Sequence, residues 1–146
     1  MSERPPPPRP RPSWRAPALV AAGGAVGALA RVALAEAFPV SPDELPWTTL
    51  VENVGGALLL GWLLTLLLER VPTSDELRLL LCTGTLGAFT TYSTFATELA
   101  ERLLGGHPLL ALVYAVTSVT VGLAAATAGI WLARNGPLAP RRRSAP

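Results

Sequence analysis

Four apolar stretches constrain this chain more than any other feature. They cover residues 16–38, 46–68, 77–104 and 108–133. Each has the roughly 20 residues that an α-helix needs to cross the hydrocarbon core of a bilayer. Because backbone polar groups inside a membrane must be satisfied internally, these stretches predict four transmembrane helices. We therefore expect an all-α membrane protein, with a four-helix domain over residues 16–134, a disordered Pro- and Arg-rich tail before it (1–15) and a basic tail after it (135–146).

The arginines are divided unequally between the two ends of these spans. The chain has 12 of them and no lysine, and four spans place both termini on one side. That side collects Arg4, Arg9, Arg11, Arg15, Arg70, Arg78, Arg134, Arg141, Arg142 and Arg143, which leaves Arg31 and Arg102 on the other side. The positive-inside rule then predicts that both termini lie in the cytoplasm, and we expect the membrane to be the cell inner membrane. Arginines at helix ends rather than along one face argue against nucleic-acid binding.

The third stretch contains a segment that is poorly suited to a continuous helix. Gly84 and Gly87 precede a run of threonines that begins at Thr90. Glycine weakens a helix, and Thr and Ser side chains can bond their own backbone instead. We therefore predict a break in this helix. The carbonyl oxygens that it frees must be satisfied by protein, water or an ion, and unwound carbonyls coordinate sodium in other membrane proteins.

The second span carries polar side chains on one helix face. Thr49, Asn53 and Gly56 recur at helical spacing and present a hydroxyl, an amide and a gap. The Asn53 carboxamide has two N–H donors and suits an anion, although a hydrogen bond to a neighbouring helix would explain it equally well. Glu52 points about 100° away from Asn53, and we expect it to reach the membrane interface.

Aromatic and hydroxyl side chains recur beyond the predicted break. Tyr92 and Phe95 lie one turn apart. The positive edges of their rings could face a dehydrated anion, or the rings could simply pack. In the fourth span Tyr114 and Ser118 form a hydroxyl stripe, which could line a pathway or bond another helix.

No catalytic constellation competes with a transport role. His107 stands alone at a helix start, and Cys82, the single cysteine, has no base near it in the sequence. Neither a Gly-rich phosphate loop nor metal-ligand spacing is found in the sequence. We therefore do not expect an enzyme.

Taken together, these motifs resemble the CrcB/Fluc family of fluoride channels over all four spans. The resemblance rests on GGAVGALAR at 23–31, TLVENVGG at 49–56, GTLGAFTTYSTFATE at 84–98, and the spacing of Tyr114, Ser118 and Gly122. Tyr92 stands where the family has Phe. The resemblance implies a passive, fluoride-specific channel that exports fluoride and lowers its toxicity. It also implies an antiparallel dual-topology dimer with two pores.

The resemblance assigns roles to particular residues. The carbonyl oxygens of Gly87 and Thr90 would hold a structural sodium ion that is not transported, and Arg31 would lie near a vestibule and attract anions. The fluoride pathway would be formed by Asn53, Tyr92, Phe95, Thr91, Ser93, Thr94, Glu98, Tyr114 and Ser118.

The expected partners are fluoride, membrane lipid and a second subunit. A chain that inserts in one direction cannot form an antiparallel pair with itself, so the arginine asymmetry favours a heterodimer with a paralogue over a homodimer. Two other functions stay open at this stage. One is a small multidrug-resistance-type proton-coupled transporter, for which Glu52 is the best remaining carboxylate, and the other is a non-conducting partner subunit.

Overall fold

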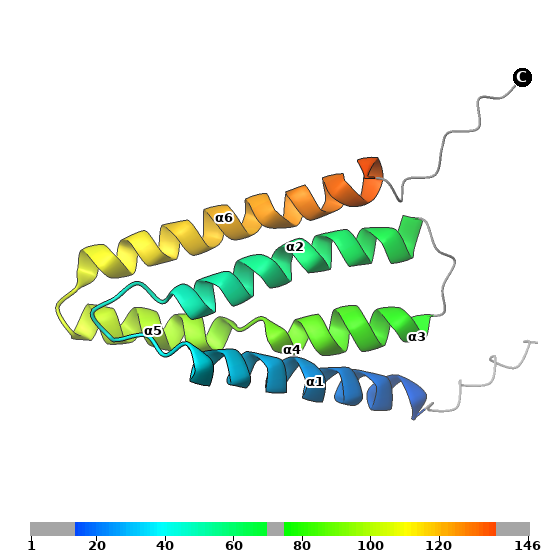
Figure 1. Ribbon diagram of the computed structural model, residues 1–146, viewed down its shortest axis with the longest axis horizontal. Coiled ribbons are helices and arrows are strands. Elements are labelled where there is room, and N and C mark those ends of the chain that lie inside the picture. The colour runs from blue at the N-terminus through cyan, green and yellow to red at the C-terminus, as the bar shows by residue number, and fades with distance from the viewer. Residues whose placement is uncertain (1–13, 70–74, 137–146) are drawn as a thin grey trace, which may run out of the picture.

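The computed structural model describes residues 14–69 and 75–136 (Figure 1). Three long helices are α1 (Arg15–Ala37), α2 (Trp47–Glu69) and α6 (Pro108–Asn135). Between α2 and α6, the third apolar stretch forms α3 (Asp75–Leu77), the π-helix η1 (Arg78–Leu86), α4 (Gly87–Phe89) and α5 (Tyr92–Leu104). The bounds agree with the four predicted stretches to within about two residues. Most of the two predicted tails, 1–13 and 137–146, lies outside the described residues.

The described residues form an all-helical multi-pass membrane protein. Helices α1, α2 and α6 are each long and apolar enough to cross a bilayer. The third stretch does not form one such helix, because its helical pieces are separated at Thr90 and Thr91. The expectation of four spans is therefore met by three continuous helices and one interrupted helix.

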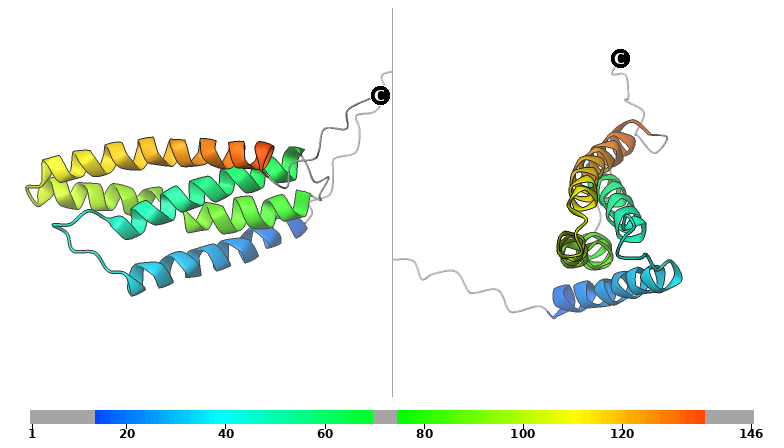
Figure 2. Two further views of the ribbon diagram at one scale, coloured as in Figure 1. Left: turned by 45° about the horizontal axis from the view of Figure 1, so that its top comes forward. Right: turned by 90° about the vertical axis from the view of Figure 1, so that its left-hand side faces the viewer.

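The helices run up and down beside one another. The α1–α2 connection and the α5–α6 turn lie at the same end of the bundle (Figures 1 and 2). Helix α2 packs mainly along α6, whereas α1 packs mainly along η1 and α4, and α5 meets α6. The interrupted helix is therefore held between the α1 side and the α2–α6 side of the molecule.

Glycines permit the two closest helix contacts. Gly23 and Gly27 are buried where α1 meets η1, and a Cβ atom at Gly27 would collide with the carbonyl of Thr85. On the other side, a Cβ atom at Gly129 of α6 would collide with the carbonyl of Leu58 of α2. Small residues let membrane helices approach this closely, since packing rather than hydrophobicity drives their association.

The predicted break in the third helix is also confirmed. Thr90 (φ −76°, ψ 151°) and Thr91 (φ −143°, ψ 122°) are extended. Before them the chain is already wound more loosely than an α-helix, because the Gly87 N–H donates to the carbonyl of Cys82, five residues earlier. π-Helical turns are rare and often occur at functional sites. The local weakness that Gly and Thr introduce thus appears as a wide turn followed by an interruption.

Candidate ion pathway

Asn53 compensates for the interrupted backbone. Its Nδ2 donates to the Thr91 carbonyl at 3.0 Å, and its Oδ1 accepts from the Thr91 N–H at 2.8 Å. The carboxamide thereby replaces the helical partners that Thr91 lacks. Of the two open interpretations of Asn53, the helix-to-helix hydrogen bond is therefore present. Because a carboxamide has two N–H donors, one remains for another acceptor.

Three carbonyl oxygens at the break accept no side-chain hydrogen bond. Within residues 14–69 and 75–136, no side chain donates to the carbonyl of Gly87, Phe89 or Thr90. The neighbouring Ala88 carbonyl accepts from Arg31 Nε at 3.2 Å. Arg31 is half-buried at the break, where it satisfies a carbonyl left free by the end of α4.

Glu98 joins three helices through two hydroxyl groups. Thr49 Oγ1 of α2 donates to its Oε1 at 2.8 Å, and the Tyr114 hydroxyl of α6 donates to its Oε2 at 2.7 Å. Tyr114 is completely buried, with 0% of its surface exposed. The carboxylate is thus fixed by neutral donors from both sides.

A cavity of about 390 Å³ lies beside the break. Its polar and aromatic lining comes from Asn53, Thr90, Thr91, Tyr92, Phe95 and Ser118. The Ser118 Oγ is buried and has no hydrogen-bond partner in the described part of the chain. An unpartnered buried hydroxyl is costly, so it marks a place where a ligand or water could bind.

Aromatic rings connect this cavity to the Glu98 cluster. The rings of Tyr92 and Phe95 have centroids 6.0 Å apart, and those of Phe95 and Tyr114 are 5.1 Å apart at an interplanar angle of 53°. Tilted arrangements direct positive ring edges toward neighbouring groups. Tyr92 is 80% exposed, so much of its ring has no neighbour within the chain.

Ser93 and Thr94 lie at the start of α5 and not on the cavity lining. The Thr91 Oγ1 accepts from the Thr94 N–H at 3.1 Å and caps the helix. The same oxygen lies 3.0 Å from Thr94 Oγ1 and 3.2 Å from Ser93 Oγ. These hydroxyl groups form a local cluster that orders the first turn after the break.

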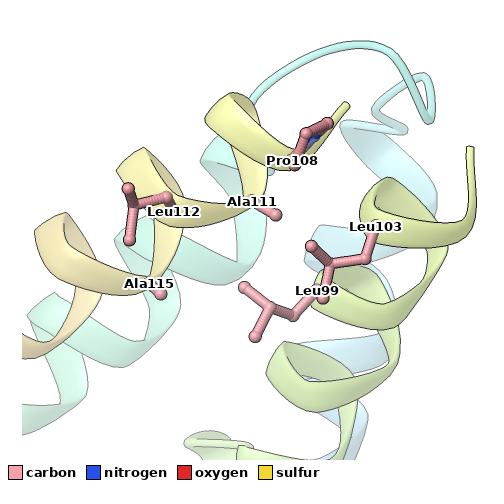
Figure 3. A pocket seen from close by; sticks show the side chains of 6 residues that line it. All are labelled: Leu99, Leu103, Pro108, Ala111, Leu112 and Ala115. Carbon is pink, nitrogen blue, oxygen red and sulfur yellow. The ribbon is translucent and has the colours of Figure 1, made fainter. Parts of the chain in front are cut away.

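A second cavity, of about 340 Å³, differs in its chemistry. It lies between α5 and α6 and is lined by Leu99, Leu103, Pro108, Ala111, Leu112 and Ala115 (Figure 3). No polar side chain contributes to it. Since an ion must have its hydration shell replaced by polar groups, this cavity is unsuitable for ions.

Two charged residues lie where the sequence interpretation did not place them. The expectation that Glu52 reaches the interface is wrong: the residue is 3% exposed, and its Oε1 has no partner among the described residues. The position of Glu52 on the face of α2 away from Asn53 buries it in the bundle. The sequence places Arg102 at the end of a span, where a charge would be expected to reach water, yet the residue is 2% exposed. Its position four residues after Glu98, one helical turn, was the available signal.

Comparison with known proteins supports the family resemblance that the sequence motifs indicate. A family model described as CrcB-like protein, Camphor Resistance (CrcB), matches residues 18–130. The fluoride-specific ion channel FluC 1 of Mycobacterium bovis is 47% identical over 116 residues, which cover 80% of this chain and 88% of that protein. The protein of the same name from Moorella thermoacetica is 45% identical over 116 residues, covering 79% and 83%.

The match to a less similar relative covers nearly the full length of that relative. The fluoride-specific ion channel FluC of Agrobacterium fabrum is 39% identical over 119 residues, which cover 81% of this chain and 95% of that protein. The matched region contains the interrupted helix and every residue of the candidate pathway. The chain therefore belongs to the CrcB/FluC family of fluoride-specific ion channels.

Proposed function

We propose that fluoride crosses the membrane passively along the cavity beside the helix break, past Asn53, Ser118 and the rings of Tyr92 and Phe95. The observation that carries this proposal is the composition of that cavity. It combines a carboxamide with a spare N–H, a buried hydroxyl without a partner, and two tilted aromatic rings. Each of these groups can present a partial positive charge to a small anion.

The physical requirement is the replacement of water. Fluoride is small and strongly hydrated, so a narrow path must offer N–H, O–H and ring-edge donors in place of its water shell. A larger anion such as chloride would fit this set of short donors less well. The hydroxyl cluster of Thr91, Ser93 and Thr94 would extend the polar track beyond the cavity. So would Glu98 with its two hydroxyl donors, Thr49 and Tyr114.

Outward flow needs no other energy source. A cell interior that is electrically negative drives an anion outward by about 2.3 kcal/mol per charge for each 100 mV. A passive conductor would therefore lower fluoride in the cytoplasm. Membership of an ion-channel family also confirms that the chain is not an enzyme, and it replaces the hypothesis of a drug transporter.

A structural sodium ion at the carbonyls of Gly87 and Thr90 forms part of the proposal. These two oxygens lie at the break and accept no hydrogen bond from a described side chain, and neutral oxygens suit a hard monovalent cation. When bound, the ion would neutralise exposed carbonyl dipoles inside the membrane. We expect exhaustive removal of sodium to lower dimer stability and fluoride flux together. Unchanged stability and flux in sodium-free buffer would contradict this role.

The working unit that we propose is an antiparallel dimer. The cavity is open on one side, and Tyr92 on its rim is 80% exposed, so a second subunit would complete the wall. Exposed apolar side chains on the outer faces of α1 and α6, such as Val26 and Leu123, suit contact with lipid. Because ten of the twelve arginines would face the cytoplasm, we favour a partner paralogue of opposite orientation.

Orientation can be tested directly in cells. A topology reporter on the C-terminus should show one predominant, cytoplasmic orientation in the inner membrane. The chain expressed alone should then rescue fluoride-sensitive cells only partly. Equal populations of the two orientations together with full rescue would establish the homodimer instead.

Fluoride efflux from liposomes tests the function itself. Vesicles that contain the purified chain, alone or with an oppositely oriented paralogue, should release fluoride to an external electrode and retain chloride. Ser118→Ala should slow fluoride, whereas Thr127→Ala should not, because the Thr127 hydroxyl is exposed and donates to Leu123 of its own helix at 2.8 Å. Equal fluoride and chloride flux would contradict selectivity, and no flux under any condition would identify a non-conducting subunit.

A further inference from the structure

Arg102 is a buried positive charge that contacts only neutral acceptors. Its Nε and Nη2 donate to the Glu44 carbonyl at 3.0 and 2.7 Å, its Nη1 donates to the Glu98 carbonyl at 2.9 Å, and Nη2 lies 3.5 Å from the Ser41 carbonyl. Within residues 14–69 and 75–136, no carboxylate forms an ion pair with it. Arginine is almost never fully buried unless its charge is compensated.

Glu98 has the complementary property. Its two oxygens accept hydrogen bonds from the hydroxyl groups of Thr49 and Tyr114, and both of these donors are neutral. The negative charge is therefore held in place but not neutralised by contact. A carboxylate fixed beside an anion pathway would repel the anion unless a positive charge offset it.

Tyr114 lies between these two charges. The Arg102 guanidinium carbon is 5.9 Å from the centre of the Tyr114 ring, whose hydroxyl bonds Glu98. The two charged residues are also one turn apart on α5. In a buried region of low dielectric constant, opposite charges at such distances interact strongly even without contact.

Glu52 of α2 is a second buried carboxylate, with 3% of its surface exposed. Arg31 is occupied at the helix break by the Ala88 carbonyl. Arg31 is therefore held at the break. Arg102 instead lies against the Tyr114 ring and donates to the Glu98 carbonyl, which makes it the cation placed to offset Glu98.

We propose that Arg102 is the charge-balancing residue of the fluoride pathway: it offsets the negative charge of Glu98, so that an anion can pass the Thr49, Glu98 and Tyr114 cluster. This inference rests on the proposed function. Arg102 acts as a positioning residue, since it reaches the pathway through the Tyr114 ring and the Glu98 backbone. Its bonds to the 39–46 connection also hold that connection over the end of the cluster.

Charge balance can be separated from this mechanical role by a double-mutant cycle in liposomes. Arg102→Gln should lower fluoride flux about tenfold in the otherwise unchanged chain, because Glu98 is left uncompensated. In a Glu98→Gln background the same change should cost less than about threefold, because the charge to be offset is gone. Arg102→Lys, which keeps the charge but not the planar fork, should retain flux to within about threefold.

Assembly provides a second readout if Arg102→Gln folds poorly. Charge balance predicts that adding Glu98→Gln restores the yield of assembled protein. The control is Arg134→Gln at the other end of the bundle, where the ion pair with Glu69 is exposed and flux should not change. Equal losses from Arg102→Gln in both backgrounds, with Arg102→Lys equally impaired, would overturn the charge-balancing role. Arg102 would then act only by holding the 39–46 connection. A wild-type chain without fluoride flux would instead contradict the proposed function.

Discussion

Helix α6 and the interrupted third helix, which meet only along α5 among the main contacts, satisfy their backbones in opposite ways. α6 runs for 28 residues without interruption, and the hydroxyl groups of Thr120 and Thr127 bond carbonyls of their own helix. The third helix stops at Thr90 and Thr91. Asn53 of α2 bonds the N–H and carbonyl of Thr91, and Arg31 of α1 bonds the carbonyl at position 88.

The difference shows why the polar residues gather where they do. In a membrane, an interrupted backbone must find partners in the protein, so polar side chains on neighbouring helices converge on the break. Those side chains have donor capacity left over, which an anion can use. The continuous helix contributes mainly packing contacts, whereas the polar groups that could contact an anion gather around the interrupted helix.

The largest effect should come from damaging the continuous side. Gly129→Leu would force α6 away from α2, because a side chain there meets the Leu58 carbonyl. We expect a loss of about 3 kcal/mol in stability, measured as the assembled fraction after heating in detergent. Gly122→Leu is the control, since no neighbouring atom lies within 4 Å of a Cβ at that position. Equal stability of the two variants would show that the α2–α6 contact does not depend on close approach.

The next largest effect should come from removing the two hydrogen bonds that Asn53 makes to the backbone at the break. Asn53→Ala leaves the Thr91 backbone groups unpaired and removes the spare N–H donor. We expect fluoride flux to fall by about 100-fold, as when a preorganised donor is lost from an active site. Asn135→Ala should have no effect, because that side chain bonds Trp131 of its own helix at 3.0 Å and is exposed. Normal flux through well-assembled Asn53→Ala would limit Asn53 to a structural role.

A smaller effect should follow loss of one aromatic edge. Phe95→Ile keeps an apolar side chain between Tyr92 and Tyr114 but removes the ring. Ring-edge contacts of this kind are worth up to a kcal/mol or so, which corresponds to a loss of about tenfold in fluoride flux. The amount of protein incorporated into the same vesicles serves as the control for assembly. Undiminished flux after this change would mean that the rings serve only to pack.

The smallest effect compares two threonine hydroxyl groups directly. Thr91→Ala removes the cap of α5 and should lower stability by about 1 kcal/mol. Thr120→Ala removes an exposed hydroxyl that donates to Val116 at 2.7 Å, and it should stay within about 0.5 kcal/mol of the wild type. Thermal unfolding in detergent measures both. If the two substitutions were equally mild, the break would not rely on the Thr91 hydroxyl.

Local sequence was sufficient to predict the helices and the break. Apolar stretches of membrane-spanning length set the bounds of α1, α2 and α6, and the Gly and Thr run predicted the interruption at Thr90 and Thr91. The spacing of Thr49 and Asn53 also placed both on one face of α2, and in the structure that face meets the broken helix. Each of these inferences depends on residues close together in the chain.

The burial and the hydrogen-bond partners of the charged residues could be decided only by the tertiary structure. Helical periodicity places Glu52 away from Asn53, but it cannot say whether that side faces lipid, water or another helix. The packing of the bundle buries Glu52 to 3% exposure and Arg102 to 2%. Arg102 finds its acceptors at Ser41 and Glu44, about sixty residues earlier, because the α1–α2 connection folds over the end of α5.

The sequence by itself thus determined the class of protein, the interrupted helix and the residue types that an anion pathway needs. Tertiary structure decided which of those residues share a cavity, which carbonyls at the break are bonded by side chains, and how the charges of Glu98 and Arg102 are arranged around Tyr114. The physical reason is that helix formation follows from local propensity and length, whereas hydrogen-bond partners and burial depend on contacts between residues far apart in the chain.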